Sequence, residues 1–199
     1  MKKTIIKTAL ITLLSLILVV VSAFGVSALF FPSALGDVFD KLGNYDASVR
    51  YYEKAYLKSD DTGDLYNLVA KLSDSDGARV EKYCSELLRK SDFADFCKIR
   101  DEKEPSSVNT KQFVSGKYVV ALYRNGKLST AIDFGNDYCK DEGKYEAYNP
   151  LYFLVAESNN MNESDINDLR NNLLSIKSSF SDVSAIDADI NVLTDLLTK

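Results

Sequence analysis

Hydrophobic and polar residues follow two different patterns along the chain. From Thr8 to Phe31 the residues are nearly all apolar, and none of these 24 positions carries a charge. After Phe31, apolar residues recur every three or four positions in each long segment, which is the spacing of one face of an α-helix. Only the short segment 118–123 would also allow a strand. The pattern therefore predicts an all-α protein, with one apolar helix followed by a helical domain over 33–199.

The apolar stretch is long enough to span a membrane. About 20 helical residues, each rising about 1.5 Å, cross the hydrocarbon core. Lys2, Lys3 and Lys7 are the only charges before the stretch. By the positive-inside rule, segment 1–7 is predicted to stay in the cytoplasm and 8–31 to form a single transmembrane helix of bacterial type. Everything beyond this helix is then extracytoplasmic.

A cleaved signal peptide is the alternative interpretation of the same stretch. The small-residue tripeptides Val21–Ala23 and Val26–Ala28 match the pattern of a cleavage site after a basic start and an apolar core. However, a signal core usually has about 7 to 15 residues, and this stretch continues past both tripeptides. An uncleaved anchor is therefore the favoured prediction, and a secreted helical protein remains the alternative.

The segment after the anchor predicts two helices joined by a glycine turn. A glycine inside the first helix lets the second approach closely, and a glycine at the turn can adopt the left-handed conformation that ends a helix. In the second helix, aromatic and apolar side chains, including Tyr45, Tyr52 and Tyr56, recur about once per turn and are predicted to pack on the first. The positions that define the pattern are Leu35, Gly36, Phe39, Gly43, Tyr45, Ser48, Val49, Tyr52 and Ala55. This arrangement resembles a tetratricopeptide repeat.

Further helices follow the first pair. A second pair over 65–88 has a degraded signature, whereas a third over 116–139 aligns better with the first, and the short segment 91–100 predicts one helix between them. The C-terminal segment 149–199 is helical on periodicity alone. Its predicted helix starts are Asn149–Pro150, Ser164 and Ser184.

The resemblance implies an antiparallel helix-pair solenoid whose concave side binds a peptide or a partner helix. The positions that would face this groove are Asp37, Asp40, Lys41, Lys71, Tyr123 and Arg124. The same side chains also fit ordinary exposed positions. The implied function is a membrane-anchored protein–protein interaction module, an adaptor or scaffold whose partner the sequence does not identify. The alternative is a structural accessory subunit of an envelope complex, such as a translocase, division or cell-wall assembly.

The amino-acid composition limits which ligands the chain can bind and which reactions it can catalyse. Beyond the anchor the chain has 21 basic and 29 acidic residues, and this net charge of −8 argues against nucleic-acid binding and against a basic face lying on the membrane. The chain has no histidine, the usual general base and the commonest metal ligand. Its three cysteines lack redox or zinc spacing and are predicted to be core residues. We therefore expect no catalytic, cofactor-binding or metal-binding residues and no enzymatic activity.

Overall fold

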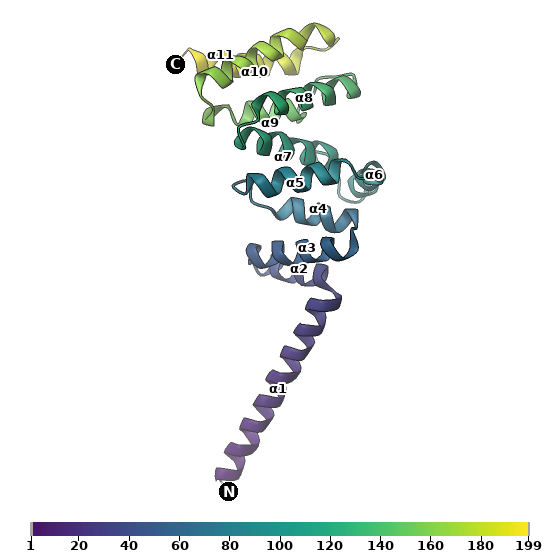
Figure 1. The fold of residues 1–199 in the computed structure, drawn as a ribbon, viewed down its shortest axis with the longest axis vertical. Helices are drawn as coiled ribbons and strands as arrows, with labels where there is room; N and C mark the ends of the chain where they lie inside the picture. The colour runs from purple at the N-terminus through teal and green to yellow at the C-terminus, as the bar shows by residue number, and fades with distance from the viewer. Residues whose placement is uncertain (1, 199) are drawn as a thin grey trace. The chain divides into compact units, whose positions relative to one another are not determined.

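The computed structural model describes residues 2–198, and within this range all regular secondary structure is helical (Figure 1). The predicted all-α class is thus confirmed, and segment 118–123, which also allowed a strand, lies within a helix. The chain divides into two compact units, Met1–Lys71 and Leu72–Lys199. This boundary separates the two helices that the sequence suggested as a second pair, because one ends at Lys71 and the other begins at Gly77.

The first unit begins with α1, Lys2–Phe30. Its part Ile11–Phe30 has 20 residues and a mean hydropathy of 2.6, and none of the side chains described in it is buried, so it is long and apolar enough to cross a membrane. A signal sequence near an N-terminus can meet the same criterion of length and hydropathy. The helix ends at Phe30 because Phe31 precedes Pro32, and the proline ring disfavours helical dihedrals in the residue before it.

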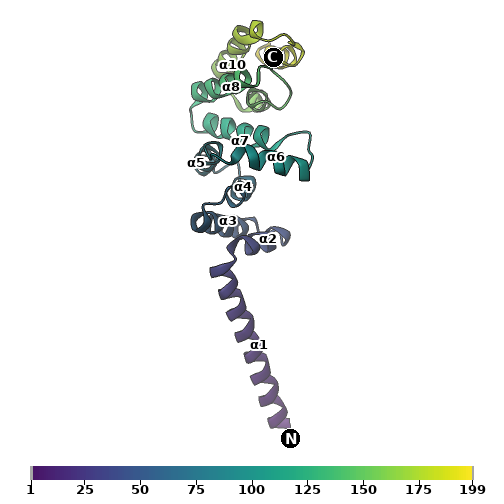
Figure 2. The same cartoon turned by 90° about the vertical axis from the view of Figure 1, so that its right-hand side faces the viewer.

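Three shorter helices complete the first unit: α2 (Pro32–Lys41), α3 (Tyr45–Ser59) and α4 (Thr62–Lys71). In Figure 2, α1 leads into α2 and α3, which lie side by side. Gly43 ends α2 at φ +71°, and the Asn44 side chain then caps α3 by accepting a hydrogen bond from the Ala47 amide at 3.2 Å. The predicted glycine turn is confirmed.

The α2–α3 contact depends on Gly36. A Cβ built on Gly36 would lie 2.7 Å from two ring carbons of Tyr52, a distance that no packed structure allows. The Tyr52 hydroxyl donates a hydrogen bond of 2.6 Å to Asp37, which ties the two helices together. Burial raises the pKa of Tyr52, and the hydrogen bond to Asp37 adds to this effect. The predicted close approach at Gly36 is confirmed, whereas the predicted packing of Tyr45 is wrong, because its side chain is 62% exposed in the first turn of α3.

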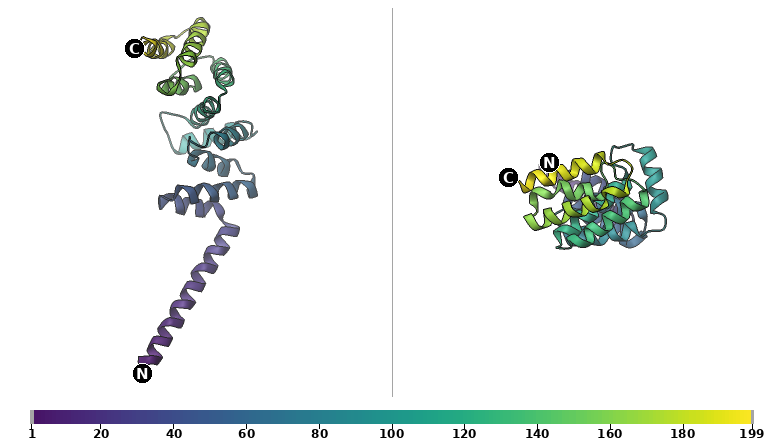
Figure 3. Two further views of the ribbon diagram at one scale, coloured as in Figure 1. Left: turned by 60° about the vertical axis from the view of Figure 1, so that its left-hand side comes forward. Right: turned by 90° about the horizontal axis from the view of Figure 1, so that it is seen from above.

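The second unit contains the remaining helices, and in Figure 3 α10 and α11 lie side by side in it. Within this unit α7 packs against α5 as well as against α8 and α9 (Figure 1). The α-helices are α5 (Gly77–Leu88), α6 (Phe93–Lys103), α7 (Thr110–Arg124), α8 (Leu128–Glu142), α9 (Pro150–Ala156), α10 (Glu163–Ile176) and α11 (Ser184–Leu197). Two 3₁₀ helices, η1 (Ser158–Asn160) and η2 (Lys177–Ser179), follow α9 and α10.

Two glycines set the helix packing of this unit. A Cβ on Gly116 would overlap the ring of Phe153, so α7 and α9 approach closely there. Gly135 of α8 is similarly close to Leu151, with 2.5 Å between a built Cβ and the nearest side-chain carbon. The core around these contacts consists largely of leucines that are fully buried: Leu122, Leu151, Leu154, Leu169, Leu173 and Leu193.

The helix starts in the C-terminal segment test three predicted caps. Asn149 caps α9 as predicted, because its side chain accepts from the Tyr152 amide at 3.1 Å. The predicted cap at Ser164 is wrong: Asn162 accepts from the Asp165 amide at 2.9 Å and starts α10 two residues earlier. The cap at Ser184 is also wrong: Ser184 is the first residue of α11, the N-cap position is Val183, and Asp182 accepts from the Ser184 amide at 2.9 Å. Asparagine is at least as good a cap as serine, so Asn162 caps α10 in place of Ser164.

Candidate functional site

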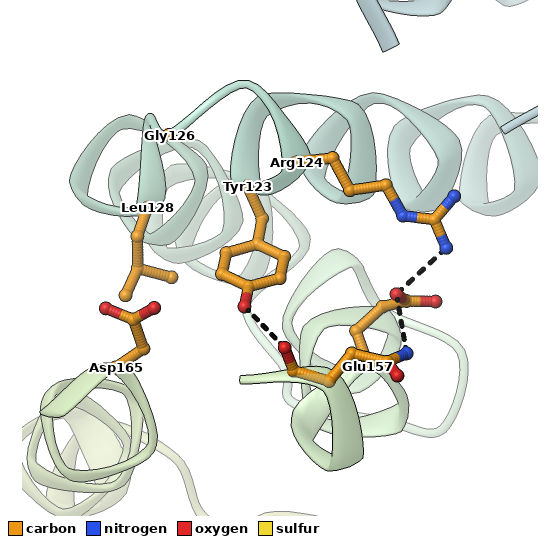
Figure 4. Close-up of a pocket in the computed structure, with 7 residues that line it drawn as sticks. Tyr123, Arg124, Gly126, Leu128, Glu157 and Asp165 are labelled. Carbon is orange, nitrogen blue, oxygen red and sulfur yellow. Dashed lines mark hydrogen bonds and ion pairs between the residues drawn. The ribbon is translucent and has the colours of Figure 1, made fainter. Parts of the chain in front are cut away.

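The second unit contains a surface pocket where the end of α7 faces the chain after α9. Its volume is about 560 Å³. Figure 4 shows its lining side chains, which come from four separate segments of this unit. The lining residues are Tyr123, Arg124, Gly126, Leu128, Glu157, Asn160 and Asp165.

The end of α7 positions two of these side chains. Gly126 adopts φ +74°, which a side chain with a Cβ rarely tolerates. The Gly126 amide donates a hydrogen bond to the backbone carbonyl of Tyr123 at 2.8 Å, and the Lys127 amide donates one to the backbone carbonyl of Leu122 at 2.9 Å. These two bonds form the Schellman motif that closes a helix, and the Gly43 turn of the first unit has the same pair of bonds. The motif leaves Tyr123 and Arg124 in the last turn of α7.

Arg124 connects three segments of the second unit. One guanidinium nitrogen lies 2.9 Å from a carboxylate oxygen of Glu157, and another donates at 2.9 Å to the backbone carbonyl of Asp74. Glu157 caps the C-terminus of α9 and also accepts, at 3.5 Å, from the Asn160 side-chain amide. Because the Arg124 side chain is 33% exposed, these contacts orient the guanidinium and leave part of it accessible at the pocket.

Tyr123 contributes a hydroxyl group that stays protonated. The hydroxyl donates to the backbone carbonyl of Asn160 at 3.2 Å (Figure 4). Burial raises the pKa of Tyr123, and the nearby carboxylates of Asp165 and Glu157 raise it further. The phenol is therefore neutral at physiological pH and acts as a hydrogen-bond donor.

Asp165 contributes a carboxylate to the pocket. It lies in the first turn of α10, and one carboxylate oxygen accepts from the Asn162 side-chain amide at 2.9 Å. Among the side chains that the structure describes, in 11–23 and 25–198, no basic group forms an ion pair with Asp165. Figure 4 shows its carboxylate directed toward Leu128. With Glu157 partly neutralised by Arg124, the pocket has a net negative charge and one apolar wall.

The lining groups can bind a ligand by hydrogen bonds and ion pairs. Across the part of the chain that the structure describes, no three side chains of the metal-binding types come together. The cysteines are buried and free, as predicted for core residues. Burial raises the pKa of Cys84 and Cys139 to about 12 and that of Cys97 to about 11, so these thiols are neutral and poorly nucleophilic.

The predicted groove residues fall into two groups. Tyr123 and Arg124 lie together in the pocket of the second unit. The other four belong to the first unit, where the structure brings Asp40 and Lys71 together and gives Asp37 and Lys41 separate environments. Asp37 accepts from Tyr52, Asp40 forms a 2.7 Å ion pair with Lys71, and Lys41 is exposed at the end of α2.

Sequence reasoning missed the pocket residues contributed by the chain after α9, namely Glu157, Asn160 and Asp165. The apolar spacing of the C-terminal segment predicts helices but not what their ends face. The polar run Glu157–Asn160 directly after the apolar α9 was the available signal, because such a run predicts an exposed connection. That this connection faces the end of α7 depends on tertiary packing.

No family model, curated protein or solved structure matches this chain.

Proposed function

We propose that this protein is a membrane-anchored interaction module whose tetratricopeptide-like helical region lies outside the cytoplasm. The pocket at the end of α7 carries the proposal, because it combines the two expected groove residues Tyr123 and Arg124 with polar groups from two other segments. Such a pocket suits a side chain presented by a peptide or helix of a partner protein. The anchor would hold the module at high local concentration near membrane partners.

Two helix pairs support the tetratricopeptide-like part of the proposal. The pair α2–α3 and the pair α7–α8 are both closed by a Schellman turn with a left-handed glycine, Gly43 and Gly126. In the first pair, Gly36 meets Tyr52 as the repeat pattern expects. In the second pair, the glycines of close approach are Gly116 of α7 and Gly135 of α8, and both meet side chains of α9 instead.

The chemistry of the pocket indicates the kind of group it binds. Asp165 offers a carboxylate with no ion-pair partner among the described side chains, beside the apolar side chain of Leu128 and the partly exposed phenol of Tyr123. A lysine or arginine side chain of the partner fits this combination, since its aliphatic part packs on leucine and tyrosine while its cation pairs with the carboxylate. We therefore expect the partner to present a basic residue.

Site-specific photocrosslinking tests this assignment. A photoreactive phenylalanine analogue at position 160 is expected to crosslink a partner protein in membranes, because Asn160 is exposed at the pocket. Its backbone carbonyl, which accepts from Tyr123, is unaffected by the replacement. The matched control is position 191, an exposed asparagine on α11 outside the pocket. Equal crosslinking to the same protein at both positions would contradict a role for the pocket.

Removing the charge of Asp165 tests whether the partner protein presents a basic residue to the pocket. Asp165→Asn keeps an oxygen that can accept from Asn162 but removes the charge. A hydrogen bond to a charged group contributes about 1.5–3 kcal/mol, so the partner should bind about tenfold more weakly or worse. Unchanged binding together with specific crosslinking at position 160 would retain the pocket but exclude a cationic ligand group.

The anchor is tested by the N-terminus of the mature protein. We expect membrane-extracted protein to begin at or near Met1, because the uncharged stretch is longer than a signal core. Intact mass measurement and N-terminal sequencing provide the check. A soluble form that begins at Phe24 or Leu29 would show that the stretch is a cleaved signal peptide.

A further inference from the structure

Two lysines of α3 contact the last turn of the apolar helix α1. The Lys54 ammonium donates to the backbone carbonyl of Ala28 at 2.6 Å, and the Lys58 ammonium donates to that of Leu29 at 3.0 Å. Carbonyls at a helix C-terminus lack intrahelical partners and carry partial negative charge, so ammonium groups are favourable there. Lys58 also lies 5.5 Å from the centre of the Phe30 ring, within the range of a cation–π interaction.

These contacts place both charges at the end of the apolar stretch. Ile11–Phe30 has 20 residues, and at about 1.5 Å per residue this matches the thickness of the hydrocarbon core, about 30 Å. Ammonium groups bonded to residues 28 and 29 therefore lie where hydrocarbon meets lipid headgroups. An ammonium has three N–H donors, and each of these lysines uses one on a carbonyl of α1.

An exposed leucine lies on the same face of α3. Leu57 and Lys58 lie three and four residues after Lys54, so both are neighbours of Lys54 on the helix surface. The Leu57 side chain is 71% exposed, although the domain buries most of its other leucines. A large apolar side chain beside two lysines has the composition of a helix face that lies in a membrane interface.

A mostly apolar cavity of about 420 Å³ adjoins this face. It lies within the first unit, between the end of α1, the start of α2 and the end of α3. Its acidic residue, Asp64, accepts a 2.7 Å hydrogen bond from the Ser59 hydroxyl. The lining residues are Phe30, Phe31, Pro32, Ser33, Ala34, Ala55, Lys58, Ser59 and Asp64.

We propose that the face of α3 formed by Lys54, Leu57 and Lys58 lies on the membrane surface and binds the headgroup phosphate of an anionic phospholipid. Leu57 enters the interface, and the cavity beside Phe30 takes the glycerol and upper acyl region of the lipid. The site continues directly from the spanning helix, so the inference rests on the anchoring part of the proposed function but not on the pocket at Tyr123. The net charge of −8 argued against a basic membrane face, but it averages over the whole domain and does not describe this surface.

Tryptophan fluorescence in lipid nanodiscs provides the test, because the chain contains no natural tryptophan. The full-length Leu57→Trp variant is inserted into nanodiscs of phosphatidylcholine with brominated acyl chains, with and without phosphatidylglycerol. We expect quenching of the introduced tryptophan that increases with phosphatidylglycerol. Replacing Lys54 and Lys58 by glutamine in this variant should weaken docking in phosphatidylglycerol by about fivefold per lysine. The matched controls are Ile99→Trp, 53% exposed in the second unit, and Lys98→Gln, an exposed lysine of α6.

The outcomes separate this inference from the proposed function. Quenching at position 57 that is no greater than at position 99 would overturn lipid binding by this face. So would a phosphatidylglycerol effect that persists when Lys54 and Lys58 are replaced by glutamine but disappears with Lys98→Gln. If crosslinking from position 160 persists in that case, the interaction module remains valid without the lipid site. A chain that fails to insert into nanodiscs would overturn both the anchor and the lipid site.

Discussion

Gly36→Leu is expected to destabilise the first unit by about 1–3 kcal/mol, the usual effect of overpacking a close helix contact. The reason is the Tyr52 ring, whose carbons lie 2.7 Å from the position that a Cβ would occupy. The ring cannot move away freely, since its hydroxyl is bonded to Asp37 and its side chain is only 3% exposed. Hydrogen exchange over α2 and α3 in the detergent-solubilised chain measures this local loss.

The smaller substitution Gly36→Ala gives a test by sign. At an exposed helix position, alanine is more favourable than glycine by about 0.5–1 kcal/mol. At Gly36 we expect the opposite sign, because even one methyl group meets the ring. In a Tyr52→Leu background the ring is absent, and the same substitution should become neutral or stabilising. A stabilising effect of Gly36→Ala in the natural background would show that α2 and α3 do not pack closely at this point.

Tyr145→Phe is expected to cost the second unit about 1–3 kcal/mol at neutral pH, because it leaves a buried carboxylate without its donor. The Tyr145 hydroxyl donates to Asp189 of α11 at 2.6 Å, and the two residues are only 4% and 7% exposed. Phe180 packs edge-on against Tyr145 at 6.1 Å between ring centres, which keeps the aromatic ring in place in the variant. Urea unfolding followed by circular dichroism measures the change.

The pH dependence gives this prediction a second readout. Burial raises the pKa of Asp189 above its ordinary value, and the hydrogen bond from Tyr145 partly offsets the rise. A carboxyl whose pKa is raised in the folded state contributes stability at pH below its ordinary pKa, and loses it as pH rises through the raised value. Without the Tyr145 donor the pKa rises further, so the penalty of Tyr145→Phe should be larger near pH 7 than near pH 4.

Asp189→Asn is the matched variant. It keeps the size of the side chain and an oxygen that accepts from Tyr145, but it cannot ionise. The contribution of this site to the loss of stability between about pH 4 and about pH 7 should therefore disappear. If the natural protein and Asp189→Asn depend on pH identically over this range, Asp189 does not titrate with a raised pKa.

Local sequence signals accounted for the elements whose cause is local. Gly43 ends α2 because only a residue without Cβ tolerates the left-handed conformation readily, and Asn149 starts α9 through its own side chain. The N-cap of α10 is Asn162, two residues before Ser164, and the N-cap of α11 is Val183, one residue before Ser184. In both places a side chain just upstream, Asn162 or Asp182, accepts from a nearby backbone amide. The residues that set each of these helix ends lie within a few positions of it, so the local sequence contains the information even where the predicted cap is wrong.

The sequence by itself determined the all-helical class, the apolar N-terminal helix, the glycine turns and the close approach at Gly36. Tertiary structure alone decided that Glu157 and Asp165 meet Tyr123, that Lys54 and Lys58 reach the end of α1, and that Tyr45 is exposed. Helical periodicity specifies which face of a helix is apolar, but not which other segment covers that face. That choice depends on contacts between residues 26 or more positions apart, as between Lys54 and Ala28 or between Arg124 and Glu157, which no local pattern records.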